Sequence, residues 1–194
     1  MGNEIINITD ENNPAIYIQS ICMEDINDTY VNWLNDPQVN QYLETRFSHQ
    51  TVDSVTSFVQ NIIINPNEYL FTIRTRDNCH IGNIKVGAIN THHATGEVSL
   101  FIGDKNSWGK GYATLAIRLI SHFAFSTLKI RKLSAGAYQS NIASTKAFIK
   151  AGYKMDGIKK DHCLSNNEIV DAVYVCLFSH QAKILNSIAI ENKS

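Results

Sequence analysis

One stretch in the middle of the chain is more informative about architecture than any other. It reads Glu97-Val98-Ser99-Leu100-Phe101-Ile102-Gly103-Asp104-Lys105-Asn106-Ser107-Trp108-Gly109-Lys110-Gly111-Tyr112-Ala113. Its first six residues are typical of a strand, and its last two begin an amphipathic helix. A glycine-containing loop between a strand and a helix aims free backbone N–H groups and the positive helix end at an anion. Such a loop suits a pyrophosphate best, although the same glycines also suit a tight turn that binds nothing.

Two common nucleotide-binding motifs do not fit this stretch. A P-loop has four residues between its first glycine and its Gly-Lys pair, whereas five separate Gly103 from Gly109, and Gly111 stands where the magnesium-binding Ser or Thr belongs. A dinucleotide fingerprint needs Gly or Ala where this chain has Thr114. The loop therefore argues against nucleoside triphosphates and nicotinamide cofactors.

The segments on either side alternate between strand-like and helix-like patterns. Helices are expected at 24–34, at 52–64, along the apolar stripe from 112 to 123, and at 142–151. Strands are expected at 15–21, 69–75, 81–89, 97–102, 132–138, 153–161 and 169–178. This order predicts an α/β fold with a mixed, mostly antiparallel seven-stranded sheet flanked by helices. The tail after about residue 180 has no strong signal.

Composition bounds the classes of protein to consider. A chain of 194 residues with 44% hydrophobic and 18% charged residues predicts a single globular domain, with its core at about 15–180. The net charge of -1 argues against nucleic acid as a partner. Four cysteines without a C-x-x-C pair suggest neither a zinc site nor disulfides, and we expect mostly buried thiols. With no signal peptide and no long apolar run, we expect a cytoplasmic monomer or homodimer with no membrane partner.

Two motifs occur in order, with the expected elements between them. The first is Trp108-Gly109-Lys110-Gly111-Tyr112-Ala113-Thr114, and the second runs from Asn141 through a Ser-bearing helix to Lys150-Ala151-Gly152-Tyr153. Together they resemble the signatures of the GNAT acetyltransferases, in particular the branch of ribosomal-protein N-terminal acetyltransferases. Asn106 departs from the Gln or Arg that usually opens the first motif. The resemblance covers roughly residues 70–177 and implies an acetyl-CoA-dependent N-acetyltransferase.

The resemblance also implies where acetyl-CoA binds. The cofactor would lie in a splayed V between the strands that end at Ile102 and Tyr138, with its pantetheine arm paired to the main chain of the first strand and held by Asn141 on the other wall. Backbone N–H groups of 107–113 would hold the pyrophosphate, and no metal is expected. The residues implied in cofactor binding are Phe101, Ile102, Asn106, Ser107, Trp108, Gly109, Lys110, Gly111, Tyr112, Ala113, Asn141, Ser144 and Phe148.

Direct acetyl transfer needs a base for the acceptor ammonium and an acid for the leaving thiolate. Glu97 is the candidate base, because relatives in this branch often carry a Glu at the start of this strand; a solvated strand-edge carboxylate is the alternative. Phe148 stands where many members of the superfamily have a tyrosine acid. Ser144 and Tyr138 therefore remain as candidate acids, each of which could instead have a structural role, in helix capping and in the core respectively.

The acceptor is suggested by the aromatic, amide-rich segment from Trp33 to Arg46. Its residues could form a cleft wall for a neutral polar acceptor, or a helix end packed into the core. We select Trp33, Tyr42, Arg46 and Glu97 as candidate substrate-binding residues. The segment also resembles acetyltransferases that act on nucleotide-linked amino sugars, so an amino sugar is the favoured acceptor. A peptide N-terminus, an aminoglycoside and a polyamine stay open, as does a non-catalytic acyl-CoA-binding sensor.

Overall fold

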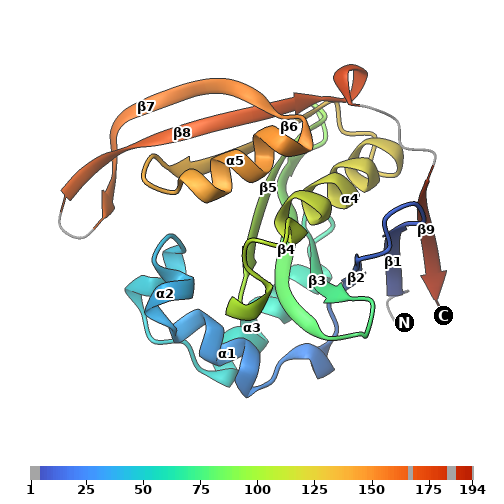
Figure 1. Ribbon diagram of the computed structural model, residues 1–194, viewed down its shortest axis with the longest axis horizontal. Coiled ribbons are helices and arrows are strands. Elements are labelled where there is room, and N and C mark those ends of the chain that lie inside the picture. The colour runs from blue at the N-terminus through green and yellow to red at the C-terminus, as the bar shows by residue number, and fades with distance from the viewer. Residues whose placement is uncertain (1–4, 166–167, 183–186, 194) are drawn as a thin grey trace.

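The computed structural model describes residues 5–165, 168–182 and 187–193. A single nine-stranded sheet has helices on both faces (Figure 1). Its strands, in spatial order, are β7 (Lys154–Ser165), β8 (Glu168–Phe178), β6 (Lys132–Tyr138), β5 (Thr95–Ile102), β4 (His80–Asn90), β3 (Tyr69–Thr75), β2 (Ile16–Ser20), β1 (Ile5–Asp10) and β9 (Ile188–Lys193).

The helices divide into two groups on opposite faces of the sheet. The first group is α1 (Asp28–Asn35), α2 (Pro37–Asn40) and α3 (Val52–Ile64), and the second is α4 (Tyr112–Ser126) and α5 (Ile142–Ala151). Short 3-10 turns complete the chain: η1 (Met23–Asp25), η2 (Glu44–Phe47), η3 (Lys105–Ser107) and η4 (Ser179–Gln181). Each group covers its own apolar cluster, and the larger cluster lies between the sheet and α4.

The sheet has one parallel pair, β5 with β6, and that pairing is short. It joins Thr95 to Lys132, Gly96 to Leu133 and Glu97 to Ser134. Beyond these residues β5 pairs only with β4, and β6 pairs only with β8. The two strands therefore part after Glu97, which confirms the predicted V beside the glycine loop.

Local sequence signals account for the helix bounds. Thr51 and Ser54 form a reciprocal capping box at the start of α3. Asn27 caps α1 by accepting from the Tyr30 amide, so α1 begins later than the predicted 24–34 helix. Pro37 does not merely end α1: it occupies the first turn of α2, where Asp36 caps the new helix through the Gln38 amide.

The predicted count of seven strands was wrong, because β1 and β9 were missed. The two strands pair with each other in antiparallel register from Ile5–Lys193 to Asp10–Ile188, and β1 also pairs with β2. Each segment is only six residues long, and the alternation in β1 is confined to Ile6-Asn7-Ile8-Thr9, so the sequence signal is weak. The tail after about residue 180, which has no strong sequence signal, contributes β9, the outer strand of the sheet.

One smaller expectation also needs correction, and one polar residue of α4 is buried. Ser121 lies in the core, and its hydroxyl lies 2.9 Å from the Tyr153 hydroxyl. The four cysteines are free thiols, but Cys176 alone is buried and Cys79 is exposed. Polar contacts across the core, which periodicity cannot reveal, explain the burial of Ser121.

Candidate active site

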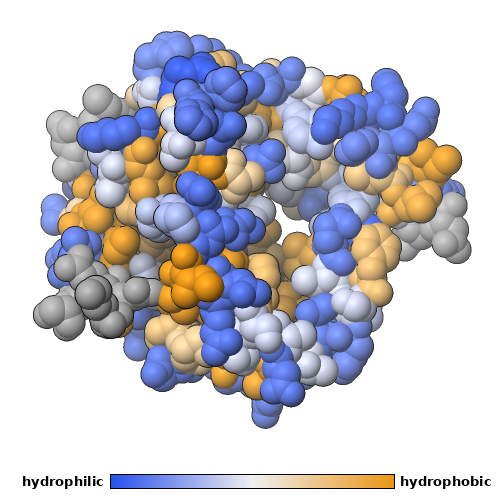
Figure 2. All heavy atoms as spheres, turned by 180° about the vertical axis from the view of Figure 1, so that it is seen from behind, coloured by the Kyte–Doolittle hydropathy of each residue, from blue (hydrophilic) through white to orange (hydrophobic). Residues whose placement is uncertain are grey.

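A cavity of about 760 Å³ lies where β5 and β6 separate. Residues of β7, β8 and α5 line it on one side, and residues of α1, η2 and α3 line it on the other; Figure 1 shows where these elements lie. In the space-filling view from behind, a hollow opens between these two halves of the molecule (Figure 2). The predicted site residues that line the cavity are Tyr42, Glu97, Phe101, Tyr138, Asn141, Ser144 and Phe148.

Glu97 lies at the point of separation, in the last residue pair that joins β5 to β6. On its other side it pairs with Gly87 of β4, and its side chain is exposed to the cavity. Within the described residues no salt bridge and no side-chain hydrogen bond involves its carboxylate. A carboxylate without a partner at the inner end of a cavity is placed to accept a proton from a bound amine.

A second carboxylate nearby is neutralised. Glu68 Oε1 accepts from Lys85 Nζ at 3.1 Å, and both side chains line the cavity. A Cβ atom added at Gly87 would lie 3.0 Å from Glu68 Oε1, so this ion pair borders the strand position that faces Glu97. The pair adds no net charge to the cavity wall.

The Tyr138 hydroxyl is engaged at the end of β6. It donates to Glu44 Oε1 at 2.6 Å and accepts from Arg46 Nη2 at 2.8 Å. Burial raises the pKa of Tyr138, and Glu44 raises it further. A less acidic phenol whose proton already binds a carboxylate is a poor source of a proton for a thiolate.

Arg46 and Trp33, both selected as substrate-binding residues, are not among the residues that line the cavity. Arg46 lies behind Tyr138, where its guanidinium also donates to the Leu164 carbonyl at 2.9 Å. Trp33 covers Gly103, at which an added Cβ would lie 2.1 Å from the indole ring, and contacts the edge of His80. Close packing holds Trp33 in the helix–sheet interface, outside the cavity lining.

Asp104 organises the glycine loop. Its carboxylate accepts from the Asn106 amide at 3.1 Å and from the Ser107 hydroxyl at 2.6 Å. Gly109 and Gly111 have φ of 74° and 81°, a left-handed conformation that favours glycine. A Cβ at either glycine would meet nothing within 4 Å, so the space above the loop is open.

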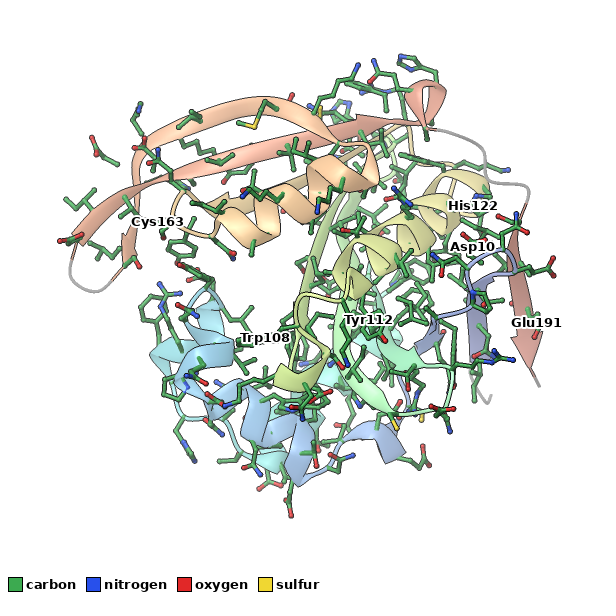
Figure 3. The ribbon with its side chains drawn as sticks, viewed as in Figure 1. Asp10, Trp108, Tyr112, His122, Cys163 and Glu191 are labelled. Atoms are coloured by element: carbon green, nitrogen blue, oxygen red, sulfur yellow. The ribbon has the colours of Figure 1, made fainter. Side chains whose placement is uncertain are left out.

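The loop ends at the start of α4 without a side-chain cap, because Gly111 occupies the capping position. The first amides of a helix have no intrahelical partner, so those of Tyr112 and Ala113 can bind an anion. Trp108 and Tyr112 lie at this end of the loop (Figure 3). The Trp108 indole donates to the Ile102 carbonyl at 2.8 Å. That carbonyl is therefore already hydrogen-bonded, whereas the family resemblance implied that the main chain of this strand would be free to pair with the pantetheine arm.

The opposite wall is formed by the start of α5. Asn141 Oδ1 accepts from the Ser144 amide at 3.2 Å and caps the helix, which leaves the Asn141 amide nitrogen for a ligand. Ser144 is half-buried and lines the cavity. Phe148 is buried and packs edge-on against Tyr153 at 5.0 Å, so it supplies apolar surface and no proton.

Several cavity residues were not selected from the sequence. They are Tyr30, Glu44, Thr45, Gln50, Phe58, Glu68, Asn83, Lys85, Lys159, His162 and Tyr174. Alternation along β4 could have found two of them, since Asn83, Lys85 and Gly87 share one face. No comparable signal marks Glu44 or Lys159, which reach the cavity from η2 and β7.

Two features of the described part of the chain bear on other classes of protein. No helix among those residues is long and apolar enough to cross a membrane. No group of three or more His, Cys, Asp or Glu side chains in the same residues could hold a metal ion.

Comparison with known proteins places this architecture in a family. The profile described as "Acetyltransferase (GNAT) domain" matches residues 16–154. A crystal structure of spermidine N-acetyltransferase from Vibrio cholerae in complex with CoA and spermine shares the fold, with a TM-score of 0.79 and 18% identity over 87% of this chain and 98% of that chain.

Relatives found by sequence agree with this family. The uncharacterized N-acetyltransferase p20 of Bacillus licheniformis is 21% identical over 79% of this chain and 88% of its own length. Probable N-acetyltransferase YjcK of Bacillus subtilis is 34% identical over 51% of this chain and 55% of its own, and Escherichia coli spermidine N(1)-acetyltransferase is 27% identical over 52% and 53%. These relatives do not confirm the resemblance to the ribosomal-protein branch. The match over most of the chain shows that it belongs to the GNAT acetyltransferase family and is an acetyl-CoA-dependent N-acetyltransferase.

Proposed function

We propose that this enzyme acetylates the primary amine of a nucleotide-linked amino sugar, with Glu97 as the general base. The single observation that carries the proposal is the position of Glu97, an unpaired carboxylate at the inner end of a cavity whose other charges are largely matched. An amine that enters the cavity would meet Glu97 where β5 and β6 part.

The chemistry requires two proton transfers. An ammonium has no lone pair, so Glu97 first takes one proton, directly or through a water. The amine nitrogen then forms a bond to the thioester carbonyl carbon, the carbon–sulfur bond breaks, and the sulfur leaves with the electron pair. The nitrogen loses a second proton and the thiolate gains one, so the reaction releases one proton overall.

The residues present fit acetyl-CoA, which supplies the acetyl group as a thioester. The amides at the start of α4 and the open space above Gly109 and Gly111 suit its pyrophosphate. The Asn141 amide and the unpaired edge of β5 beyond Glu97 suit the amide groups of its pantetheine arm. Ser144 is the preferred proton donor for the thiolate, because Tyr138 is bound to Glu44 and Phe148 has no exchangeable proton.

Charge balance supports an amino sugar over a polyamine. The named substrate of several relatives is spermidine, and a polycation needs carboxylates that are not already matched. In this cavity Glu68 is paired with Lys85, Glu44 accepts from Tyr138, and Lys159 adds a positive charge. Aromatic and amide side chains, including Tyr42, Tyr174 and Gln50, suit the faces and hydroxyl groups of a sugar ring.

The test is thiol release from acetyl-CoA across a panel of amines: UDP-glucosamine, glucosamine, spermidine, an aminoglycoside and a peptide with a free N-terminus. We expect the highest kcat/KM with an amino sugar, and no change on adding EDTA. Preference for spermidine or for the peptide would overturn the proposed acceptor. Binding of acetyl-CoA by calorimetry with no turnover of any amine would indicate a non-catalytic acyl-CoA sensor and overturn the proposed function.

A further inference from the structure

Two buried side-chain atoms of the described residues lack a hydrogen-bond partner, and both belong to residues that line the cavity. They are Thr45 Oγ1, on η2, and Asn83 Nδ2, on β4. Buried polar atoms are nearly always paired, since leaving one unpaired costs about 1–3 kcal/mol. Two unpaired atoms in one cavity indicate that a ligand completes their hydrogen bonds.

The orientation of the Asn83 amide follows from its neighbour. His80 Nε2 lies 3.1 Å from the Gly82 carbonyl and 2.7 Å from Asn83 Oδ1. A backbone carbonyl only accepts, so Nε2 carries a hydrogen that Gly82 and Asn83 share. The oxygen of the Asn83 amide therefore faces His80, and its Nδ2 faces the other way.

His80 is held rigidly in this position. The Trp33 ring packs edge-on against it at 5.1 Å, and the Tyr30 ring does so at 6.0 Å. Burial lowers the pKa of His80, which keeps the ring neutral near pH 7. Trp33 does not line the cavity itself, but it packs against His80 and against Phe101, which does.

The free nitrogen lies beside Tyr30, which also lines the cavity. Burial raises the pKa of Tyr30 to about 12, and a side-chain hydrogen bond with Asn83 opposes that rise. The contact falls outside the geometry of a full hydrogen bond, so Asn83 Nδ2 keeps a hydrogen for another acceptor. At neutral pH the Tyr30 hydroxyl keeps its proton, so Asn83 and Tyr30 both offer donors.

Asn83 shares a sheet face with the proposed base. Asn83 pairs with Phe101 of β5, and Gly87, four residues along β4, pairs with Glu97. Four residues of a strand span about 13 Å. An acceptor that presents its amine to Glu97 would reach Asn83 only with a second polar group well separated from that amine.

We infer that Asn83 Nδ2 donates a hydrogen bond to an oxygen of the acceptor, a hydroxyl or a carbonyl, and that Thr45 binds a second polar group of the same molecule. A polyamine cannot fill this role, because at neutral pH its nitrogens are donors and Asn83 Nδ2 needs an acceptor. The inference rests on the proposed function and narrows it to hydroxylated or carbonyl-bearing amines. Asn83 and Thr45 are specificity-determining residues, and His80 is a positioning residue.

The test compares amines of similar ring size that differ in their hydroxyl groups. Glucosamine and UDP-glucosamine carry ring hydroxyls, whereas cyclohexylamine carries none. For the unaltered enzyme we expect kcat/KM to favour the hydroxylated amines. In Asn83→Ala that preference should fall by about tenfold, with a smaller fall in Thr45→Val, while the Kd for acetyl-CoA stays constant.

The preference is a ratio, so it does not depend on how much of each variant is folded. Asn32→Ala, an exposed asparagine of α1 outside the cavity lining, serves as the matched control and should leave the ratio unchanged. A ratio that Asn83→Ala does not alter, in an enzyme that prefers amino sugars, would overturn the inference and leave the proposed function standing. Turnover restricted to spermidine or cyclohexylamine, or no turnover with any amine, would overturn the proposed function and the inference that rests on it.

Discussion

The position of Glu97 in the sheet decides which groups its carboxylate can meet. On β5 it is one of three residues that also pair with β6, and it is the last before the strands part. The other carboxylates that line the cavity, Glu44 and Glu68, each have a hydrogen-bonded partner.

Replacement of Glu97 by glutamine keeps its shape and removes its basicity. We expect turnover in Glu97→Gln to fall by about 10²–10⁴-fold, because general-base assistance to amine attack is lost. The Kd for acetyl-CoA should stay nearly constant, and a higher pH should restore part of the rate by supplying free amine. Steady-state kinetics over a pH series, with calorimetry for the Kd, measure these effects.

Glu11→Gln is the control, since Glu11 is exposed and lies outside the cavity lining. It should match the unaltered enzyme. If Glu97→Gln also keeps its full turnover at neutral pH, the acceptor is deprotonated by another group or arrives neutral from solution.

At the scale of elements, the packing of α1 against the end of β5 positions α1 relative to the glycine loop. Gly103 is buried where the chain leaves β5, and the Trp33 ring of α1 occupies the space that a side chain would need. Both the loop and α1 depend on this contact.

The contact predicts the effect of adding one methyl group. In Gly103→Ala the new Cβ would lie 2.1 Å from Trp33 Cδ2, part of a rigid ring system. We expect a loss of about 1–3 kcal/mol in the free energy of unfolding, as is typical of overpacking. Urea denaturation measures the change.

Gly157→Ala is the matched control for that variant. An added Cβ at Gly157 would meet nothing within 4 Å, and this glycine is not among those with positive φ. The control should change stability by less than about 0.5 kcal/mol. Equal stability of the two variants would mean that α1 moves away from Gly103 at little cost.

At the scale of the whole molecule, partly buried histidines link stability to pH. Burial lowers the pKa of both His80 and His122 below the usual 6.5. Asn83 and Asp25 oppose the shift at His80, whereas Arg74, which is paired with Asp25, adds to it.

The sign of the effect follows from proton uptake. As the pH falls below 6.5, the unfolded chain binds protons at these histidines before the folded chain does, so the free energy of unfolding decreases. Urea denaturation at pH 7.5 and 5.5 should show lower stability at the acidic value, and the difference should shrink in His80→Gln. Lysine partners lower the pKa values of three carboxylates, Asp36, Asp156 and Asp171. These groups change the free energy of unfolding only below about pH 4, so they do not contribute to the difference between pH 7.5 and 5.5. Equal stability at the two pH values would contradict the assignment.

The sequence by itself determined the local structure in the middle of the chain. The expected bounds of 52–64, 132–138 and 142–151 agree with α3, β6 and α5, and the loop at Gly109 and Gly111 has the backbone that glycine permits. Helix periodicity, capping and turn chemistry depend on residues a few positions apart, so they can be found in the sequence.

The tertiary structure alone decided which distant residues meet. The pairing of β9 with β1, the packing of Trp33 on Gly103, and the meeting of Thr45, Asn83 and Glu97 in one cavity join segments far apart in the chain. Such contacts depend on how helices and strands pack over one another, a choice that no short window of sequence contains. Sequence motifs thus predicted a cofactor-binding loop and helix, whose signals are local. They missed most of the cavity residues that α1, η2 and β7 contribute, because those residues come together only in the folded chain.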